Sequence, residues 1–209
     1  MPRGEQGAPT RLVVDFVGGS VGYQFRRGSG RNHGLAKAVG LSGKYVPTVI
    51  DATAGLGRDA FLLASLGMTV TLIERRREVH DLLAAGLAAA QAAGPALAQV
   101  VARMTLLSGD ARELLGSLEA DVIVVDPMHP AGRGSALAKG EMRTLRALVG
   151  TDPDAFDLMQ VALRRARRRV VLKWPRHAAP LAGLPEPSHR ILGTTVRYDV
   201  FMMPAARPS

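Results

Sequence analysis

The chain has 209 residues, of which 47% are hydrophobic and 22% are charged, so it is long enough for one well-buried globular domain and too short for two. It contains no cysteine, which excludes disulfide bonds, thiolate metal sites and a cysteine nucleophile, and fits a reducing cytoplasm. Its 27 Lys and Arg residues outnumber its 18 Asp and Glu residues, and the net charge of +9 favours a polyanionic partner such as nucleic acid. Its five histidines are scattered, so we expect no metal site.

The first 44 residues are rich in glycine and show no helical or strand period. They contain no apolar stretch typical of a secretory signal, so we expect a cytoplasmic protein. Three arginines, Arg26, Arg27 and Arg31, lie in the middle of this segment. We interpret residues 1–44 as a basic N-terminal extension that acts as a flap over the site and contacts RNA, although a surface lead-in fits the same composition.

From residue 45 onward, apolar runs that are typical of buried strands alternate with helical patterns. We expect strands at residues 45–50, 68–74, 103–110, 120–128 and 168–175. We expect helices at residues 58–67, 77–93, 111–118 and 156–167, and a terminal hairpin at residues 189–203. The uncharged stretch 84–102 is mostly alanine and is broken by Gly-Pro, so it predicts a helix and its loop and no membrane contact. This order predicts an α/β domain over residues 45–209, with a Rossmann-like, mostly parallel sheet and a C-terminal antiparallel hairpin.

Sheets of this type bind ligands beyond the carboxyl ends of their strands. The first strand is followed by Asp51, and then by Gly55 and Gly57, which let the backbone turn sharply and approach a ligand closely. The sequence GLGRDA also fits the dinucleotide pattern G-x-G-x-x-G/A, which favours an NAD(P)-dependent reductase. Asp51 argues against a pyrophosphate at this place, because a carboxylate suits a cofactor with a positively charged amino-acid tail.

The second and third strands also end in polar residues. Glu74 ends the second strand, where an acid accepts hydrogen bonds from both hydroxyls of a ribose. NAD and S-adenosylmethionine both carry that diol, so Glu74 indicates a nucleoside cofactor without choosing between them. The pair Gly109-Asp110 closes the third strand, where it fits an adenine edge or an ordinary turn.

The fourth strand ends in DPMHP, which contains Asp126, Pro127 and His129. Amino-group methyltransferases carry an Asp/Asn-Pro-Pro-aromatic loop at this place. Its carboxylate and carbonyl accept hydrogen bonds from an exocyclic NH2 and so aim the nitrogen lone pair at the methyl donor, while the flat residue stacks on the base. We therefore interpret these three residues as catalytic, the alternative being a turn stiffened by proline.

Longer stretches carry a resemblance to a known family. They are DFVGG (15–19), GLAKAVG (34–40), VIDATAGLGRDAFLLASLG (49–67), ER (74–75), DPM-P (126–130), SAL-K-EMR-L--LVG (135–150) and VVLK-P (170–175). With these motifs the chain resembles the RsmJ-type family of bacterial 16S rRNA guanine-N2 methyltransferases. The resemblance implies S-adenosylmethionine as cofactor, and as substrate the exocyclic amine of a guanosine in the 16S rRNA of the small ribosomal subunit. It also implies that the cofactor contacts fall on Arg58, Asp59, Glu74, Arg75, Gly109, Asp110 and Asp126.

Two positions depart from the pattern of that family. The family has an aromatic residue where this chain has His129, and Lys-Arg-Pro where this chain has Lys173, Trp174 and Pro175. Trp174 is therefore a second candidate for stacking on the base, and Lys173 a candidate for contact with a phosphate, although a lysine at a strand end is as often only solvated.

Alternatives stay open at this point. The same loop chemistry fits methylation of another amino group, such as adenine N6. The pattern GLGRDA still favours an NAD(P)-dependent reductase. A non-catalytic rRNA-binding assembly factor that retains a methyltransferase fold is a further alternative. The basic cluster RRARRR at residues 164–169 either holds the rRNA backbone or is a solvated helix end.

Overall fold

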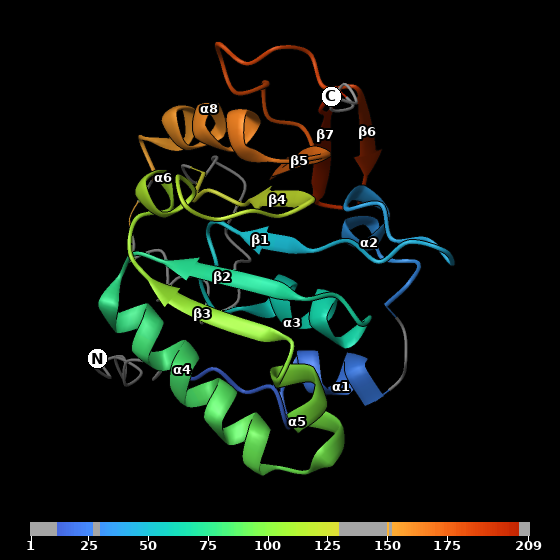
Figure 1. Cartoon of the computed structure of the whole chain (residues 1–209), viewed down its shortest axis with the longest axis vertical. Helices are drawn as coiled ribbons and strands as arrows, with labels where there is room; N and C mark the ends of the chain where they lie inside the picture. Colours follow the sequence, from blue (N-terminus) through green and yellow to red (C-terminus); the bar gives the residue numbers. More distant parts are fainter. Residues whose placement is uncertain (1–11, 27–29, 130–149, 151, 205–209) are drawn as a thin grey trace, which may run out of the picture.

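The computed structural model describes residues 12–26, 30–129, 150 and 152–204. Its centre is a seven-stranded sheet with the strand order β3-β2-β1-β4-β5-β7-β6 (Figure 1). The strands are β1 (Val49–Asp51), β2 (Val70–Glu74), β3 (Met104–Ser108), β4 (Val122–Val125), β5 (Arg169–Pro175), β6 (His189–Leu192) and β7 (Val196–Met202). Strands β1 to β5 pair in parallel, whereas β7 pairs antiparallel with both β5 and β6. This arrangement confirms the predicted α/β fold class.

Alternate residues of the parallel strands supply two hydrophobic cores, one on each face of the sheet. Val49 of β1 is in register with Val70 and Val122, and all three belong to the first core. Ile50 and Ile123, one residue further along, belong to the second core. Because a strand that is covered on both faces is apolar throughout, these strands appear as continuous hydrophobic runs in the sequence.

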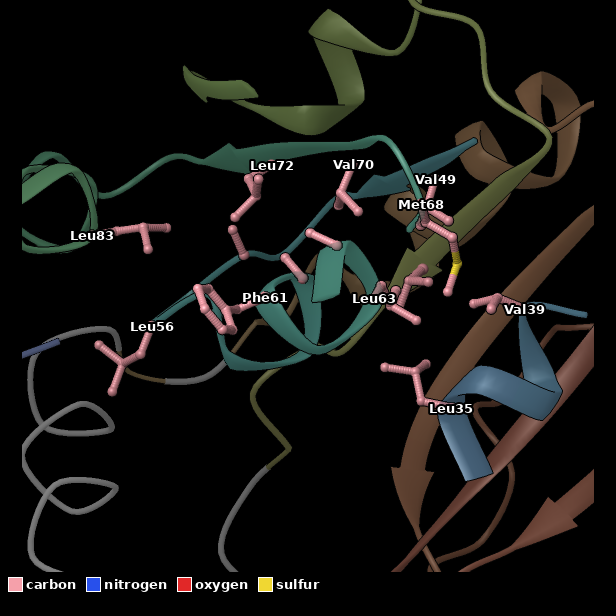
Figure 2. Packing of buried hydrophobic residues seen from close by; sticks show 14 of the residues in the cluster. Leu35, Val39, Val49, Leu56, Phe61, Leu63, Met68, Val70, Leu72 and Leu83 are labelled. Carbon is pink, nitrogen blue, oxygen red and sulfur yellow. The ribbon is translucent and has the colours of Figure 1, made fainter. Parts of the chain in front are cut away.

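Helices cover both faces of the sheet (Figure 1). They are α1 (Ser20–Arg26), α2 (Gly34–Ala38), α3 (Arg58–Ser65), α4 (Arg77–Ala92), α5 (Pro95–Val101), α6 (Ala111–Leu114) and α8 (Ala155–Arg165). Buried residues of α2, α3, α4 and α5 belong to the first core, and those of α6 and α8 belong to the second. Figure 2 shows Phe61 and Leu63 of α3 in the first core together with Val70 and Leu72 of β2.

The described part of the N-terminal segment packs against the first core. Phe16 stacks on Phe61 with ring centroids 4.5 Å apart, and Leu35 of α2 is fully buried. The sequence showed no period here because α1 and α2 have only 7 and 5 residues, too few for a helical repeat to stand out. Closure of residues 1–44 over the site stays a prediction.

Some boundaries differ from the expected ones. The stretch after α4 forms the separate helix α5, because Gly94 breaks the chain at a φ of 140° and Pro95 suits the first turn of a helix. The first strand begins at Val49 and not at residue 45, since Pro47 has no amide hydrogen for the sheet. None of the helices in the described ranges is long and apolar enough to cross a membrane.

Candidate active site

The loop between β1 and α3 holds its two glycines at positive φ, 51° for Gly55 and 70° for Gly57. A Cβ on Gly57 would lie 2.6 Å from Cδ1 of Leu83, so a larger residue does not fit there unless the core moves. A Cβ on Gly55 would meet only the carbonyl oxygen of Thr53, at 3.9 Å. The loop is therefore packed tightly at Gly57 and leaves open space beside Gly55.

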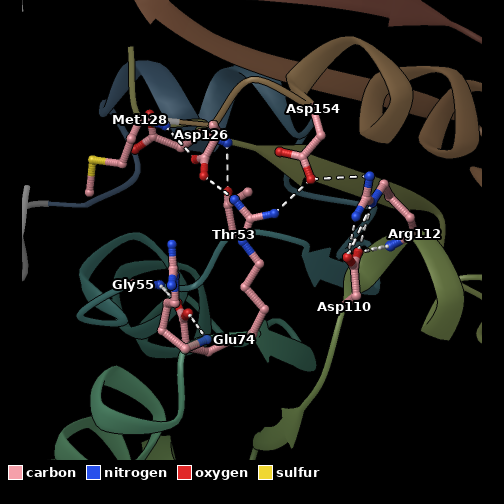
Figure 3. Close-up of polar contacts among 11 residues, drawn as sticks. Thr53, Gly55, Glu74, Asp110, Arg112, Asp126, Met128 and Asp154 are labelled. Carbon is pink, nitrogen blue, oxygen red and sulfur yellow. Dashed lines mark hydrogen bonds and ion pairs between the residues drawn. The ribbon is translucent and has the colours of Figure 1, made fainter. Parts of the chain in front are cut away.

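Glu74, at the end of β2, ties the glycine loop to the neighbouring strand (Figure 3). Its Oε2 accepts a hydrogen bond from the amide of Gly55 at 2.9 Å, and its Oε1 accepts one from the amide of Arg76 at 2.8 Å. The amide of Gly109 donates to the Glu74 carbonyl at 3.1 Å. Segments that follow β1, β2 and β3 therefore meet around this residue, as expected for parallel strands whose carboxyl ends share one edge.

The loop after β4 is held from two sides. The amide of Asp126 donates to Oγ1 of Thr53 at 2.7 Å, which joins this loop to the glycine loop. The amide of Met128 donates to Oδ2 of Asp152 at 2.7 Å, and the amide of Asp152 donates to the Met128 carbonyl at 3.3 Å. These contacts fix the backbone of the Asp-Pro-Met segment relative to both of its neighbours.

A network of ion pairs surrounds Asp154, and its contacts with Arg112 are drawn in Figure 3. Arg75 pairs with Asp152 and, at 2.6 Å, with Asp154, while Arg112 pairs with Asp110 at 2.6 Å and with Asp154 at 3.2 Å. Burial acts to raise the pKa of Asp154, but the hydrogen bond and charge of Arg75 outweigh burial and hold that pKa below its usual value. The hydrogen bond from Arg112 likewise lowers the pKa of Asp110. The acids Asp110 and Asp154 are therefore ionised at neutral pH.

These segments surround one cavity at the carboxyl ends of the strands. Its lining in the described part of the chain is Ala52, Thr53, Gly55, Ile73, Glu74, Arg75, Gly109, Asp110, Ala111, Arg112, Asp126, Pro127, Met128, Asp152, Asp154, Ala155 and Leu158. Most of the cofactor residues expected from the sequence are thus brought to one place. Four that are absent from this lining, Asp51, Gly57, Arg58 and Asp59, lie at the end of β1 or at the start of α3.

Sequence reasoning missed four polar residues of this cavity: Thr53, Arg112, Asp152 and Asp154. Thr53 lies between the expected residues Asp51 and Gly55, and no motif in the sequence singles it out. Asp152 and Asp154 stand in an Asp-Pro-Asp run directly before α8, and Asp154 is the N-cap residue of that helix. At Asp152 and Asp154 the sequence therefore shows only the pattern of an ordinary helix start.

A second group of charges lies beside the cavity. Nζ of Lys173 is 2.6 Å from Oδ2 of Asp59 and 2.8 Å from Oδ2 of Asp126. Asp51 is only 4% exposed, and its Oδ1 accepts a hydrogen bond from the amide of Thr53 at 3.1 Å. Burial, reinforced by the charge of Asp59, raises the pKa of Asp51 to about 7. Burial also raises the pKa of Asp126, and the charge of Lys173 partly offsets that rise.

The chain matches known proteins over nearly its whole length. Residues 3–203 match the family model described as "Putative SAM-dependent methyltransferase". Ribosomal RNA small subunit methyltransferase J of Rhodopseudomonas palustris (strain HaA2) is 63% identical over 193 residues, which cover 92% of this chain and 88% of that protein. The protein of the same name from Brucella anthropi is 61% identical, over 92% of this chain and 94% of that protein. The chain belongs to the ribosomal RNA small subunit methyltransferase J family.

A solved structure supports the fold of this chain. The crystal structure of a SAM-dependent methyltransferase from Neisseria gonorrhoeae aligns with a TM-score of 0.73 at 37% identity, over 94% of this chain and 76% of that one. Glu74 and the glycine loop alone left the nucleoside cofactor open. The family match identifies it as S-adenosylmethionine and favours methyl transfer over hydride transfer.

A second hollow of the chain adjoins the first along the Pro127-Met128 segment. Its lining is Pro127, Met128, His129, Asp152, Pro153, Ala155, Phe156, Trp174 and Leu181. The rings of His129 and Trp174 meet edge to face, with centroids 4.7 Å apart. The indole of Trp174 donates to the carbonyl of Ala179 at 2.8 Å and is 6% exposed, so its orientation is fixed. Stacking of either ring on a base stays a prediction.

The basic residues expected to contact RNA are distributed over the chain. Arg31 is exposed, Arg26 ends α1, and Arg27 lies outside the described residues. The cluster 164–169 lies where α8 ends and β5 begins, at the opposite edge of the sheet from the cavity, and several of its arginines bond to carbonyls and an acid of the chain itself. The SAL-K-EMR motif and Pro130 fall outside the described ranges. Within those ranges, no group of three or more His, Cys, Asp or Glu residues is placed to hold a metal ion.

Proposed function

We propose that this chain transfers a methyl group from S-adenosylmethionine to the exocyclic N2 of a guanosine in the 16S rRNA of the small ribosomal subunit. The observation that carries the proposal is that Pro127 and Met128 line both the cofactor cavity and the aromatic hollow. The DPMHP loop therefore separates a place for a methyl donor from a place for a flat base. The names of the relatives, such as the Rhodopseudomonas palustris protein, support rRNA of the small subunit as the substrate.

The residues of the cavity fit this cofactor. Glu74 stands at the end of β2, where it would accept hydrogen bonds from the ribose hydroxyls. Gly109 and Asp110 would meet the adenine, and the open space beside Gly55 leaves room for the backbone of the cofactor. Asp51 is assigned to the ammonium of the amino-acid tail, because a cation nearby stabilises the charged form of a buried carboxylate. The bound cofactor supplies a methyl group that is already activated on a sulfonium.

Since the donor is already activated, the protein's task is to position the amine. The amine of guanine is a poor nucleophile, because its lone pair is delocalised into the ring. We assign Oδ1 of Asp126 and the carbonyl of Pro127 to accept hydrogen bonds from N2, which favours a more pyramidal nitrogen with its lone pair directed at the methyl group. Holding the reacting atoms about 3–3.5 Å apart, with water excluded, is the main catalytic contribution, and the transfer needs no covalent enzyme intermediate.

The aromatic hollow is assigned to the target base. Phe156 and Leu181 give it apolar walls, and His129 and Trp174 are the candidates for stacking. A base held there has its exocyclic amine next to the DPMHP loop. We propose that the basic N-terminal segment, including Arg31, holds the rRNA backbone, and that the protein works in the cytoplasm, where small subunits are assembled.

The test is methyl transfer from labelled S-adenosylmethionine to small subunits from cells that lack this protein, with the product nucleoside identified. Wild-type protein is expected to make N2-methylguanosine, and Asp126→Ala to lose at least about 10²-fold in rate while still binding the cofactor. Asp81→Ala, at a surface acid with 64% side-chain exposure, is the matched control and keeps full activity. Methyladenosine as product contradicts the guanine assignment, and normal transfer by Asp126→Ala contradicts the role of Asp126.

A further inference from the structure

Lys173 is bound through its ammonium to two acids of the protein beside the cofactor cavity. It belongs to β5, whose residue Leu172 is in register with Val125, directly before Asp126. Only 20% of its side chain is exposed, and its ammonium bonds to Oδ2 of both Asp59 and Asp126. Through Lys173 the start of α3 is therefore connected to the DPMHP loop.

The surroundings of Lys173 are strongly acidic. Asp59 and Asp126 contact its ammonium directly, and Asp51 lies close enough for its charge to interact with all three of these residues. On the neighbouring strand β7, Tyr198 is in register with Lys173, and its pKa is raised to about 12, first by burial and then by the charge of Asp59.

The balance of charge keeps Lys173 protonated. Burial alone would lower its pKa, but the charges of Asp126 and Asp59 outweigh burial and raise the pKa above its usual value. For Asp126, burial and the charges of Asp59 and Asp152 disfavour the ionised form, and Lys173 is the neighbour that favours it. Removal of the ammonium therefore leaves the Asp126 carboxylate beside the charges of Asp59 and Asp152 with no ammonium to offset them.

We propose that Lys173 is a positioning residue, which keeps Asp126 ionised and holds its Oδ2 so that Oδ1 points to the substrate amine. The proposal rests on the proposed function, because it gives Asp126 the amine of the base as partner. Asp59 serves as the second anchor of the ammonium and prevents Lys173 from swinging away. This assignment replaces a contact between Lys173 and an RNA phosphate, since its ammonium is already bound by two carboxylates inside the protein.

The experiment compares Lys173→Met, Lys173→Arg and Arg103→Met with wild-type protein. Single-turnover methylation of small subunits is measured from about pH 6 to about pH 9, together with equilibrium binding of S-adenosylmethionine and the salt dependence of subunit binding. Lys173→Met is expected to lose about 10²-fold in rate at neutral pH, and its acidic limb to move up by about 1–3 pH units. Lys173→Arg keeps the charge and restores the rate to within about tenfold. Arg103 lies directly before β3, at the amino end of that strand, whereas the cavity lies at the carboxyl ends of the strands. Its guanidinium bonds to the carbonyl of Gln99, so Arg103→Met removes a positive charge away from the site and behaves as wild type.

The outcomes separate the possible roles of Lys173. An unchanged pH profile in Lys173→Met, combined with weaker subunit binding and a shallower salt dependence, would overturn the proposal in favour of a phosphate contact. Wild-type rates in a folded Lys173→Met protein would also overturn it. If Lys173→Met does not fold, Lys173→Arg decides between the roles. A rate within about tenfold of wild type, with the acidic limb of the pH profile at the wild-type position, supports the proposal. A larger loss of rate in Lys173→Arg opposes it. The product made by wild-type protein tests the proposed function separately.

Discussion

Replacing Gly57 by alanine tests how the packing of the glycine loop depends on the absence of a side chain. The φ of this residue is 70°, and an added Cβ would lie 2.6 Å from Cδ1 of Leu83 and 3.3 Å from Cζ of Phe16. Neither neighbour can yield easily. Leu83 is fully buried in α4, and the ring of Phe16 is stacked on Phe61.

The loss of stability has two parts. A non-glycine residue in the left-handed region costs about 1–2 kcal/mol. Forcing an extra methyl group into a packed core costs about 1–3 kcal/mol more. Gly57→Ala should therefore lose about 2–5 kcal/mol of the free energy of unfolding, a large part of the 5–15 kcal/mol or so of a typical domain.

Gly67→Ala is the matched control, because Gly67 also has a positive φ of 98° but an added Cβ would meet nothing within 4 Å. Urea unfolding of the two variants and of wild-type protein gives the free energies, provided that the three m-values agree. We expect Gly57→Ala to be less stable than Gly67→Ala by about 1–3 kcal/mol, the part that comes from overpacking. Equal stability of the two variants would refute the argument, since it would mean that Leu83 and Phe16 move at no cost.

Two further predictions concern the charges of the site. Asp51 has a pKa of about 7 in the folded protein and the ordinary value of 3.8 when unfolded, so the folded state binds the extra proton and stability falls as the pH rises through that window, by at most about 4 kcal/mol. In Asp51→Asn the fall of stability with pH disappears, which unfolding at a series of pH values would detect. Equilibrium titration should also show that the wild-type protein binds the cofactor more tightly as the pH rises through about 7, whereas the affinity of the variant does not change. Asp152→Asn weakens both the ion pair with Arg75 and the hydrogen bond from the amide of Met128, so steady-state kinetics should show kcat reduced by about tenfold with little change in KM for the subunit. An unchanged kcat would mean that the Met128 amide needs no charged partner.

The residues that could be predicted from the sequence are those that follow strands. Glu74 and Asp126 were assigned because parallel strands place their carboxyl ends at one edge, and the order of strands and helices was readable from continuous apolar runs. The partners of these residues were not predictable. Asp152 meets Arg75 across 77 positions of the chain, and nothing in an Asp-Pro-Asp helix start indicates that contact.

The direction in which a side chain points could not be predicted from the sequence either. A lysine at a strand end points to solvent or to the interior according to which neighbours surround it. The neighbours of Lys173 are Asp59, 114 positions away, and Asp126, 47 positions away. Similarly, α1 and α2 are helical because Val21, Phe25 and Leu35 pack against the core, and no local hydrophobic period in the sequence predicts these two helices.

The edge-to-face contact between His129 and Trp174 has a practical consequence, because Trp174 is the one tryptophan in the sequence. All of the tryptophan emission of the protein therefore comes from a single indole that lines the hollow beside the DPMHP loop. Indole emission responds to the polarity of its surroundings and to aromatic neighbours. Any ligand that enters this hollow or turns the imidazole of His129 changes the signal directly, so the protein carries its own optical reporter at the place where its substrate is expected.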